Sequence, residues 1–343
     1  MHRLNFASDY TEGAHPKIME ALAATNMMKT SGYGTDEISE RAREKIRLAC
    51  SCPDAEVYFL SGGTQANMTV IDALLAPYEG VVAAETGHIS SHEAGAIEFT
   101  GHKVLTLPHE LGKISAESVK RLMEAFLADG NREHTVFPGA VYISQPTEFG
   151  TLYSLKELEE LSQVCREYSL RLYCDGARLA YALGSCENTV TLPDLARLCD
   201  VFYIGGTKCG TLFGEAVVIP RKGLIPHFFT IIKQHGALLA KGRIAGVQFD
   251  TLFTEGLYES IGAPAVKAAK RIKEALIAKG CELYLDCPTN QIFVLLDDEK
   301  YNELSEKVVM SFWDKPDESH TAVRIAASWA TTEADVNELI NVF

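Results

Sequence analysis

Leu170-Arg171-Leu172-Tyr173-Cys174-Asp175-Gly176-Ala177-Arg178 is the stretch of sequence that decides the fold. In it, an apolar run of β-forming residues leads directly into a carboxylate and a turn. Comparable short apolar runs occur at 57–60, 81–84, 103–107, 140–143, 201–204 and 216–219. Helical patterns separate most of them, at 64–75, 91–99, 115–128 and 155–168. This alternation predicts a mostly parallel sheet sandwiched by helices, with ligands bound at the carboxyl ends of its strands.

The two ends of the chain show other patterns. Thr35, which is followed by acidic residues, is expected to cap a helix that runs through Leu48. Beyond Pro220 the pattern is helical to about residue 279, and strands mixed with a closing helix follow. We therefore expect three parts: an irregular segment with a helix over 1–30, a large ligand-binding domain over 31–245, and a small α+β domain over 246–343.

The composition is that of an ordinary globular protein, with 47% hydrophobic and 23% charged residues. A net charge of −14, without a local Lys/Arg cluster, argues against nucleic acid and anionic lipid as partners. No run of 18 apolar residues and no signal-peptide pattern occurs, so we expect neither a membrane span nor secretion.

Nine cysteines, an odd number without the regular spacing of a disulfide scaffold, indicate reduced thiols and a cytoplasmic protein. Cys50-Ser51-Cys52 comes nearest to a metal motif. It lacks the two-residue spacer and the second ligand pair of zinc sites. We therefore expect no metal and interpret this pair as small core residues at a helix end.

Three polar motifs follow predicted strands. Ser61-Gly62-Gly63-Thr64-Gln65-Ala66-Asn67 opens a helix, where backbone N–H groups can hold a phosphate, although a plain strand-to-helix turn would have the same pattern. It has the spacing of neither a dinucleotide fingerprint nor a P-loop. Asp175 needs a donor, which could be a protonated pyridine nitrogen or simply Arg178. Lys208, after Gly205-Gly206-Thr207, could be a desolvated imine-forming amine or a surface lysine.

Taken together, these motifs provide what pyridoxal 5'-phosphate requires: a phosphate cradle, an acid for the ring nitrogen and a lysine for the aldehyde. Further motifs make the chain resemble the threonine aldolase branch of the β-eliminating lyase family over nearly its full length. They are Ser8-Asp9, Gly87-His88-Ile89, Asp175-Gly176-Ala177-Arg178, Gly242-Arg243-Ile244-Ala245-Gly246 and Val323-Arg324-Ile325-Ala326.

The resemblance implies an aspartate-aminotransferase-like fold with a seven-stranded sheet and a role for each matching residue. Lys208 would form the Schiff base, Asp175 would bond the pyridine nitrogen, and His88 would stack on the ring and either serve as the catalytic base or orient a water that does. The remaining implied contacts are Gly63 and Thr64 to the phosphate, Arg243 and Tyr33 to a neighbour's cofactor, Arg178 to cofactor and substrate, and Ser8 and Arg324 to the substrate carboxylate.

Simpler interpretations exist for several of these residues. His88 could be a satisfied histidine at a helix start, Arg324 a strand arginine paired with a surface acid, and Arg243 a structural helix residue. Tyr33 could be an ordinary turn tyrosine. The chain also departs from the family pattern, because Ser144-Gln145-Pro146-Thr147-Glu148-Phe149-Gly150 contains no histidine. Gln65 and His92 likewise stand where relatives often carry methionine and tyrosine.

The resemblance implies retro-aldol cleavage of a β-hydroxy-α-amino acid, such as threonine or allo-threonine, to glycine and an aldehyde. The missing histidine keeps β-elimination on another amino acid open, and a non-catalytic cofactor-binding homologue is a third reading. We also expect a homodimer or a homotetramer built as a dimer of dimers, with each site formed by two chains.

Overall fold

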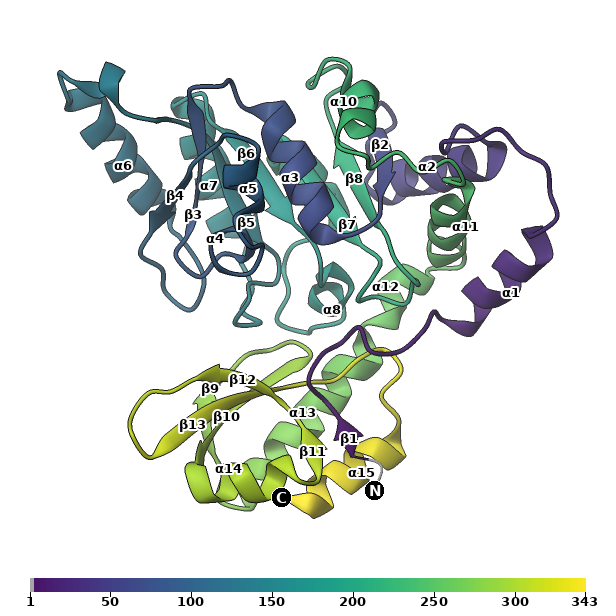
Figure 1. The fold of residues 1–343 in the computed structure, drawn as a ribbon, viewed down its shortest axis with the longest axis vertical. Coiled ribbons are helices and arrows are strands. Elements are labelled where there is room, and N and C mark those ends of the chain that lie inside the picture. Colours follow the sequence, from purple (N-terminus) through teal and green to yellow (C-terminus); the bar gives the residue numbers. More distant parts are fainter. Residues whose placement is uncertain (1–2) are drawn as a thin grey trace.

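The large part of the molecule is built on a seven-stranded sheet. The computed structural model describes residues 3–343, and the strand order is β2-β8-β7-β6-β5-β3-β4 (Figure 1). These strands are β2 (Glu56–Leu60), β3 (Glu79–Ala84), β4 (Val104–Leu107), β5 (Phe137–Ser144), β6 (Arg171–Asp175), β7 (Val201–Gly205) and β8 (Glu215–Ile219). Within this sheet β8 pairs antiparallel with both β2 and β7, and the other adjacent strands pair in parallel. The mostly parallel sheet expected from the sequence is confirmed.

Helices cover both faces of this sheet because successive strand residues point to opposite sides. Tyr142, Tyr173 and Tyr203 belong to the core beneath α3 (Gly63–Leu74) and α10 (Phe228–Gln234). Val141 and Leu172 belong to the core on the other face. The helices of that second layer include α6 (Ala116–Ala128), α7 (Leu155–Glu167), α8 (Leu179–Leu183) and α9 (Leu192–Leu198).

Two sequence expectations about helices were wrong. Asp36, not Thr35, caps α2 (Glu37–Ala49), because its carboxylate accepts from the Ser39 N–H at 2.9 Å. The expected helix over 91–99 is two short helices, α4 (His88–Ser91) and α5 (Ala96–Phe99). Ala94 and Gly95 between them have φ of 52° and 74°, so the left-handed backbone there interrupts the helix.

The small part of the molecule is a four-stranded antiparallel sheet, β12-β13-β10-β9, packed on helices (Figure 1). Its elements are α13 (Ala263–Ala278), β9 (Glu282–Leu285), β10 (Gln291–Asp297), α14 (Asp298–Ser305), β11 (Val308–Val309), β12 (Ser311–Asp314), β13 (His320–Ala326) and α15 (Glu333–Val342). The N-terminal strand β1 (Leu4–Asn5) joins this part, because it pairs with β11. Segments from both ends of the chain therefore flank the same domain.

The connection between the two parts is helical. α1 (Pro16–Thr25) and α2 both pack on α11 (Arg243–Leu252), and α12 (Leu257–Ile261) leads on to α13. The boundary expected at residue 245 falls inside α11. We propose that the large domain extends to α12 and that the division lies at the start of α13.

Within residues 3–343, no helix is both long and apolar enough to cross a membrane. The same residues contain no group of three or more His, Cys, Asp or Glu side chains arranged to hold a metal ion. All nine cysteines are free, and Cys50 is buried at the end of α2.

Candidate active site

A cavity of about 390 Å³ lies where β2, β5, β6 and β7 end. These strand ends meet at one edge of the sheet, where ligands bind in folds of this kind. Six residues predicted from the sequence line the cavity together: Gly63, Thr64, His88, Asp175, Arg178 and Lys208.

Asp175 is a buried carboxylate with four hydrogen-bond donors. It accepts from Tyr142 Oη at 2.7 Å, Tyr203 Oη at 2.5 Å, the Ala177 N–H at 2.9 Å and Asn67 Nδ2 at 3.1 Å. Burial opposes its charge, but the charge of His88 and these hydrogen bonds outweigh it, so the pKa of Asp175 is lowered. A plain ion pair with Arg178 does not explain this acid, because Arg178 pairs with Asp9 instead.

His88 belongs to the same hydrogen-bond network. Its Nδ1 lies 2.7 Å from Oε1 of Glu93, whose side chain is fully buried, and that oxygen also accepts from Asn67 Nδ2 at 2.7 Å. Asn67 therefore links the histidine to Asp175. The imidazole remains about one-third exposed toward the cavity, at 34%. A ring anchored on one side and open on the other is suited to contact a ligand.

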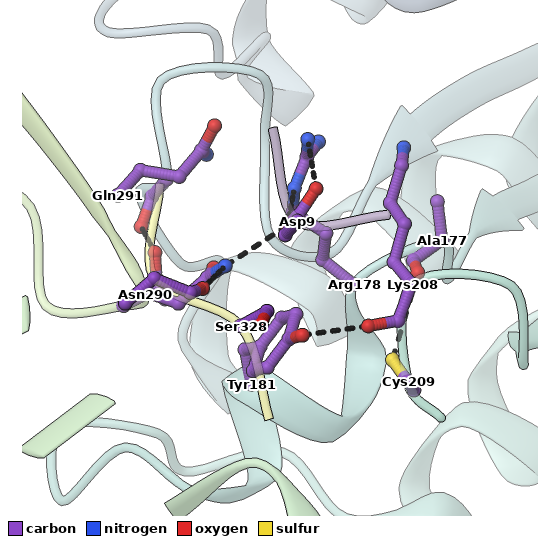
Figure 2. Close-up of polar contacts among 12 residues, drawn as sticks. Asp9, Ala177, Arg178, Tyr181, Lys208, Cys209, Asn290, Gln291 and Ser328 are labelled. Atoms are coloured by element: carbon purple, nitrogen blue, oxygen red, sulfur yellow. Dashed lines mark hydrogen bonds and ion pairs between the residues drawn. The ribbon is translucent and has the colours of Figure 1, made fainter. Parts of the chain in front are cut away.

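Lys208 follows β7 in a turn that requires glycine. A Cβ at Gly205 would lie 2.3 Å from the Ala177 carbonyl oxygen, so only glycine allows this close approach. The lysine carbonyl accepts from Tyr181 Oη at 2.6 Å, and its side chain extends beside that of Arg178 (Figure 2). Burial, followed by the charge of Arg178, lowers the pKa of Lys208. It is therefore a desolvated amine in a cavity and not a surface lysine.

The N-terminus of α3 faces the same cavity. Gly62, its N-cap residue, provides no side-chain cap, while Gly62, Gly63 and Thr64 all line the cavity. First-turn N–H groups of a helix without a side-chain cap can bind an anion. The Ser61 N–H and hydroxyl are held by Gln65 Oε1 at 3.0 and 2.7 Å, which fixes the turn that precedes the helix.

Arg178 is held rigidly beside the cavity. Its Nε and Nη2 donate to Asp9 at 2.7 and 3.0 Å, and Asn290 Nδ2 donates to Asp9 at 2.9 Å (Figure 2). Burial alone would raise the pKa of Asp9, but Arg178 and Lys208 bring it to about 2. The pair joins the N-terminal segment to the large sheet and fixes the guanidinium in one orientation.

Arg324 and Ser8 lie next to the cavity rather than in its lining. Arg324 donates to the Ala7 carbonyl at 3.1 Å and to Gln291 Oε1 and Ser311 Oγ at 3.3 Å each. No acid within residues 3–343 pairs with it, so the surface ion pair considered from the sequence is absent there. Burial, then Arg178, lowers the pKa of Arg324 to about 10. Both Arg324 Nε and Ser8 Oγ are buried without a partner in this part of the chain. Such unsatisfied polar atoms indicate a place for a polar ligand.

Comparison with known proteins agrees with this geometry. The family model described as β-eliminating lyase matches residues 5–299. The chain belongs to the β-eliminating lyase family.

Individual relatives match over nearly the whole chain. A low specificity L-threonine aldolase of Pseudomonas sp. strain NCIMB 10558 is 31% identical, covering 97% of this chain and 95% of that protein. A solved structure of Leishmania major threonine aldolase is 42% identical, with a TM-score of 0.95 and 98% of each chain covered. Thermus thermophilus aspartate aminotransferase, at 19% identity and a TM-score of 0.72 over 99% of this chain and 91% of that one, shares the fold.

Pyridoxal phosphate, the cofactor of β-eliminating lyases with this fold, fits the residues present. The N-terminus of α3 can bind the phosphate. The buried carboxylate of Asp175 can bind the protonated ring nitrogen, and Lys208 faces the same cavity as a desolvated amine. The unsatisfied atoms of Ser8 and Arg324 remain available for a further polar ligand.

Tyr33 and Arg243 lie away from this cavity within the single chain. The Tyr33 side chain is exposed, and its ring centre lies 4.5 Å from Lys233 Nζ. Arg243 donates to the backbone carbonyls of Thr25, Asn26 and Met28, at the end of α1. Their predicted contacts with a neighbour's cofactor therefore stay predictions.

Several site residues were not singled out from the sequence. Asn67 stands in the motif at 61–67 without an assigned role, and Glu93, five residues after His88, was given no role either. The strand tyrosines could have been found from the period-2 pattern of β5 to β7. Glu215, which also lines the cavity, was missed because it begins β8 one residue before the predicted strand.

The buried carboxyl group of Glu215 should make the free energy of unfolding depend on pH. Its carboxyl accepts from the Gly206 N–H at 3.0 Å and Thr207 Oγ1 at 2.8 Å, and burial raises its pKa from 4.5 to about 7. The folded state therefore holds a proton that the unfolded state releases, so stability falls as pH rises from 4.5 to about 7. The cofactor-free Glu215→Gln variant lacks this group and should gain about 3 kcal/mol relative to wild type across that window.

Urea denaturation at several pH values would measure this difference. Glu110→Gln, which changes an exposed glutamate, is the matched control and should track wild type. A constant offset between Glu215→Gln and wild type at every pH would contradict the prediction.

Proposed function

We propose that this chain is a pyridoxal-phosphate-dependent lyase that cleaves a β-hydroxy-α-amino acid, of the threonine or allo-threonine type, to glycine and an aldehyde. The observation that carries the proposal is the meeting of Lys208, Asp175 and the α3 N-terminus in one cavity. The full-length similarity to threonine aldolases supports this reaction over others of the family.

The cofactor, when bound, supplies an electron-accepting ring conjugated to the substrate nitrogen. Lys208 is assigned to the cofactor aldehyde, and its low pKa favours the neutral amine that such a bond requires. Asp175 would keep the ring nitrogen protonated, while Gly63 and Thr64 would hold the phosphate. His88, fixed by its bond to Glu93, would contact the ring.

The substrate carboxylate is assigned to Arg324 and Ser8, whose unsatisfied atoms face no other partner in residues 3–343. Arg178 cannot swing freely toward a ligand because Asp9 holds two of its nitrogens, so it contributes a fixed positive charge. Two arginines near one end of the cavity favour a substrate with a carboxylate. A carboxylate held at these residues would limit the orientation of the bonds at Cα and so select which of them breaks.

A panel of amino acids tests the proposal directly. The purified protein loaded with pyridoxal phosphate is expected to release glycine and an aldehyde from threonine, allo-threonine or a related substrate. Release of pyruvate or another keto acid from serine- or cysteine-like substrates, without glycine, would favour β-elimination instead. A protein that binds the cofactor and turns over none of these would be a non-catalytic homologue.

We also propose a cytoplasmic homo-oligomer, either a dimer or a dimer of dimers. The free cysteines suit a reducing compartment. Exposed Met27, Met28 and Tyr33 lie close to Arg243 at the start of α11, so a second chain could cover them and bring Arg243 to its cofactor phosphate.

Subunit mixing tests this shared site. Lys208→Ala and Arg243→Ala chains are each expected to be impaired, whereas a hybrid dimer holds one site with both residues intact. After subunit exchange, equal amounts should recover about a quarter of wild-type activity. A mixture of Lys208→Ala with Asp175→Asn is the matched control and should recover nothing, because both residues act within one chain. Failure of the first mixture despite proven exchange would rule out the shared site.

A further inference from the structure

The loop after β5 places a glutamate in the cavity. Glu148 lies in the segment 144–150, which carries no histidine, and it lines the cavity together with His88 and Lys208. Its Oε1 accepts from the His88 N–H at 2.9 Å and from Ser144 Oγ at 2.8 Å. These two bonds fix the carboxyl group directly beside the start of α4.

The second carboxyl oxygen of Glu148 is open. Within residues 3–343, Glu148 Oε2 has no hydrogen-bond partner, and this oxygen remains accessible to solvent. The residue is half-buried and its accessible surface faces the cavity. One oxygen is therefore used to hold the group in place, and the other is free for a ligand hydroxyl.

Glu148 differs in this respect from the other candidate base, His88. The imidazole has one nitrogen bonded to Glu93, and its neighbour His92 stacks on it with ring centres 5.8 Å apart. The second ring nitrogen of His88 is available, but the ring already contacts Glu93 on one side and His92 on another. The glutamate has no such second contact on its free oxygen.

We propose that Glu148 is the catalytic base that takes the proton of the substrate's β-hydroxyl. This role rests on the proposed aldol cleavage. As the Cα–Cβ bond breaks, the hydroxyl proton passes to Glu148 Oε2 and the C–O bond becomes the C=O of the aldehyde. The electron pair of the broken bond stays with the amino-acid carbon, which later gains one proton to give glycine.

The surroundings of Glu148 favour its protonated form more than water does. Burial raises the pKa of Glu148, and its own hydrogen bonds only partly offset this rise. A rise of the pKa above the usual glutamate value makes the carboxylate a more effective proton acceptor. The titratable or charged groups that share the cavity with it are Tyr10, His88, His92, Asp175, Arg178, Tyr203, Lys208 and Glu215.

The Glu148→Gln variant tests the role with two readouts. Glutamine keeps an oxygen for the His88 N–H but cannot take a proton, so threonine cleavage should fall about 100-fold or more. Exchange of the glycine α-proton with deuterated solvent involves no β-hydroxyl and should stay within a few-fold of wild type. The rise of the cleavage rate with pH, as Glu148 loses its proton in wild type, should disappear in the variant.

Two control variants separate loss of the catalytic base from a general effect of substitution or from loss of folding. Glu110→Gln, at an exposed glutamate, should change neither readout. Glu148→Asp retains a carboxyl group, so it should cleave faster than Glu148→Gln and keep the pH dependence, which covers the case in which the glutamine variant does not fold.

Three results would overturn the proposal: unchanged cleavage in Glu148→Gln, equal loss of cleavage and glycine exchange, or an aspartate variant no better than the glutamine one. A wild-type protein that exchanges glycine but cleaves no β-hydroxy amino acid would instead refute the proposed function, and the role of Glu148 with it.

Discussion

Lys208→Ala is expected to reduce turnover by about 10⁴-fold, because the residue is assigned to the cofactor aldehyde and no other residue of the cavity is assigned to that bond. Alanine leaves the turn intact, since the lysine's structural contact is its carbonyl, which accepts from Tyr181 Oη. The variant should still bind pyridoxal phosphate through the α3 N-terminus, but without a covalent bond.

Borohydride reduction followed by peptide mapping measures this directly. Wild type should carry the reduced cofactor on the peptide that contains Lys208, and Lys208→Ala should carry none. Lys267→Ala, at an exposed lysine of α13, is the matched control and should be labelled like wild type. Label on a different lysine of the wild-type protein would show that the site is elsewhere.

The local motifs of the site could be predicted because they depend on residues adjacent in sequence. Asp175 directly follows an apolar strand run, and Lys208 follows a pair of glycines, so the carboxyl ends of β6 and β7 were evident without knowledge of the fold. Parallel strands then bring these ends to one edge. The strands themselves were located to within a few residues, since turn-forming residues bound each run.

The partners of these residues could not be predicted, because they come from distant parts of the chain. Asp9 lies 169 residues from Arg178 in sequence, and Asn67 lies 108 residues from Asp175. A single sequence carries no signal that pairs them. The simplest local assumption, an ion pair between Asp175 and Arg178, was therefore the wrong one.

Backbone conformation explains other differences from the sequence prediction. Gly95 could have indicated the break between α4 and α5, but Ala94 also takes a positive φ, for which alanine has no preference. The antiparallel direction of β8 could not be predicted from the sequence either, because a strand's apolar pattern is the same in both directions. That reversal brings Glu215, at the first position of β8, to the cavity beside Thr207.

Asp175→Asn should reduce turnover by about 10²–10³-fold while changing cofactor affinity less than about 10-fold. Asparagine has nearly the same shape, and its NH₂ can face the Tyr142 or Tyr203 hydroxyl if that hydroxyl turns to accept, but the hydrogen bond from the Ala177 N–H or from Asn67 Nδ2 to the same position is lost. Most of the buried network therefore persists, but the negative charge is lost. Without it, the ring nitrogen has no anionic partner and the ring accepts electrons less readily.

Steady-state rates and cofactor titration of the cofactor-free protein separate these two effects. Most of the binding free energy is expected from the phosphate contacts at the α3 N-terminus, which the substitution does not touch. Asp54→Asn, at an exposed aspartate, serves as the matched control. Unchanged turnover in Asp175→Asn would remove Asp175 from the mechanism, whereas an equal loss of affinity and turnover would assign it to cofactor binding alone.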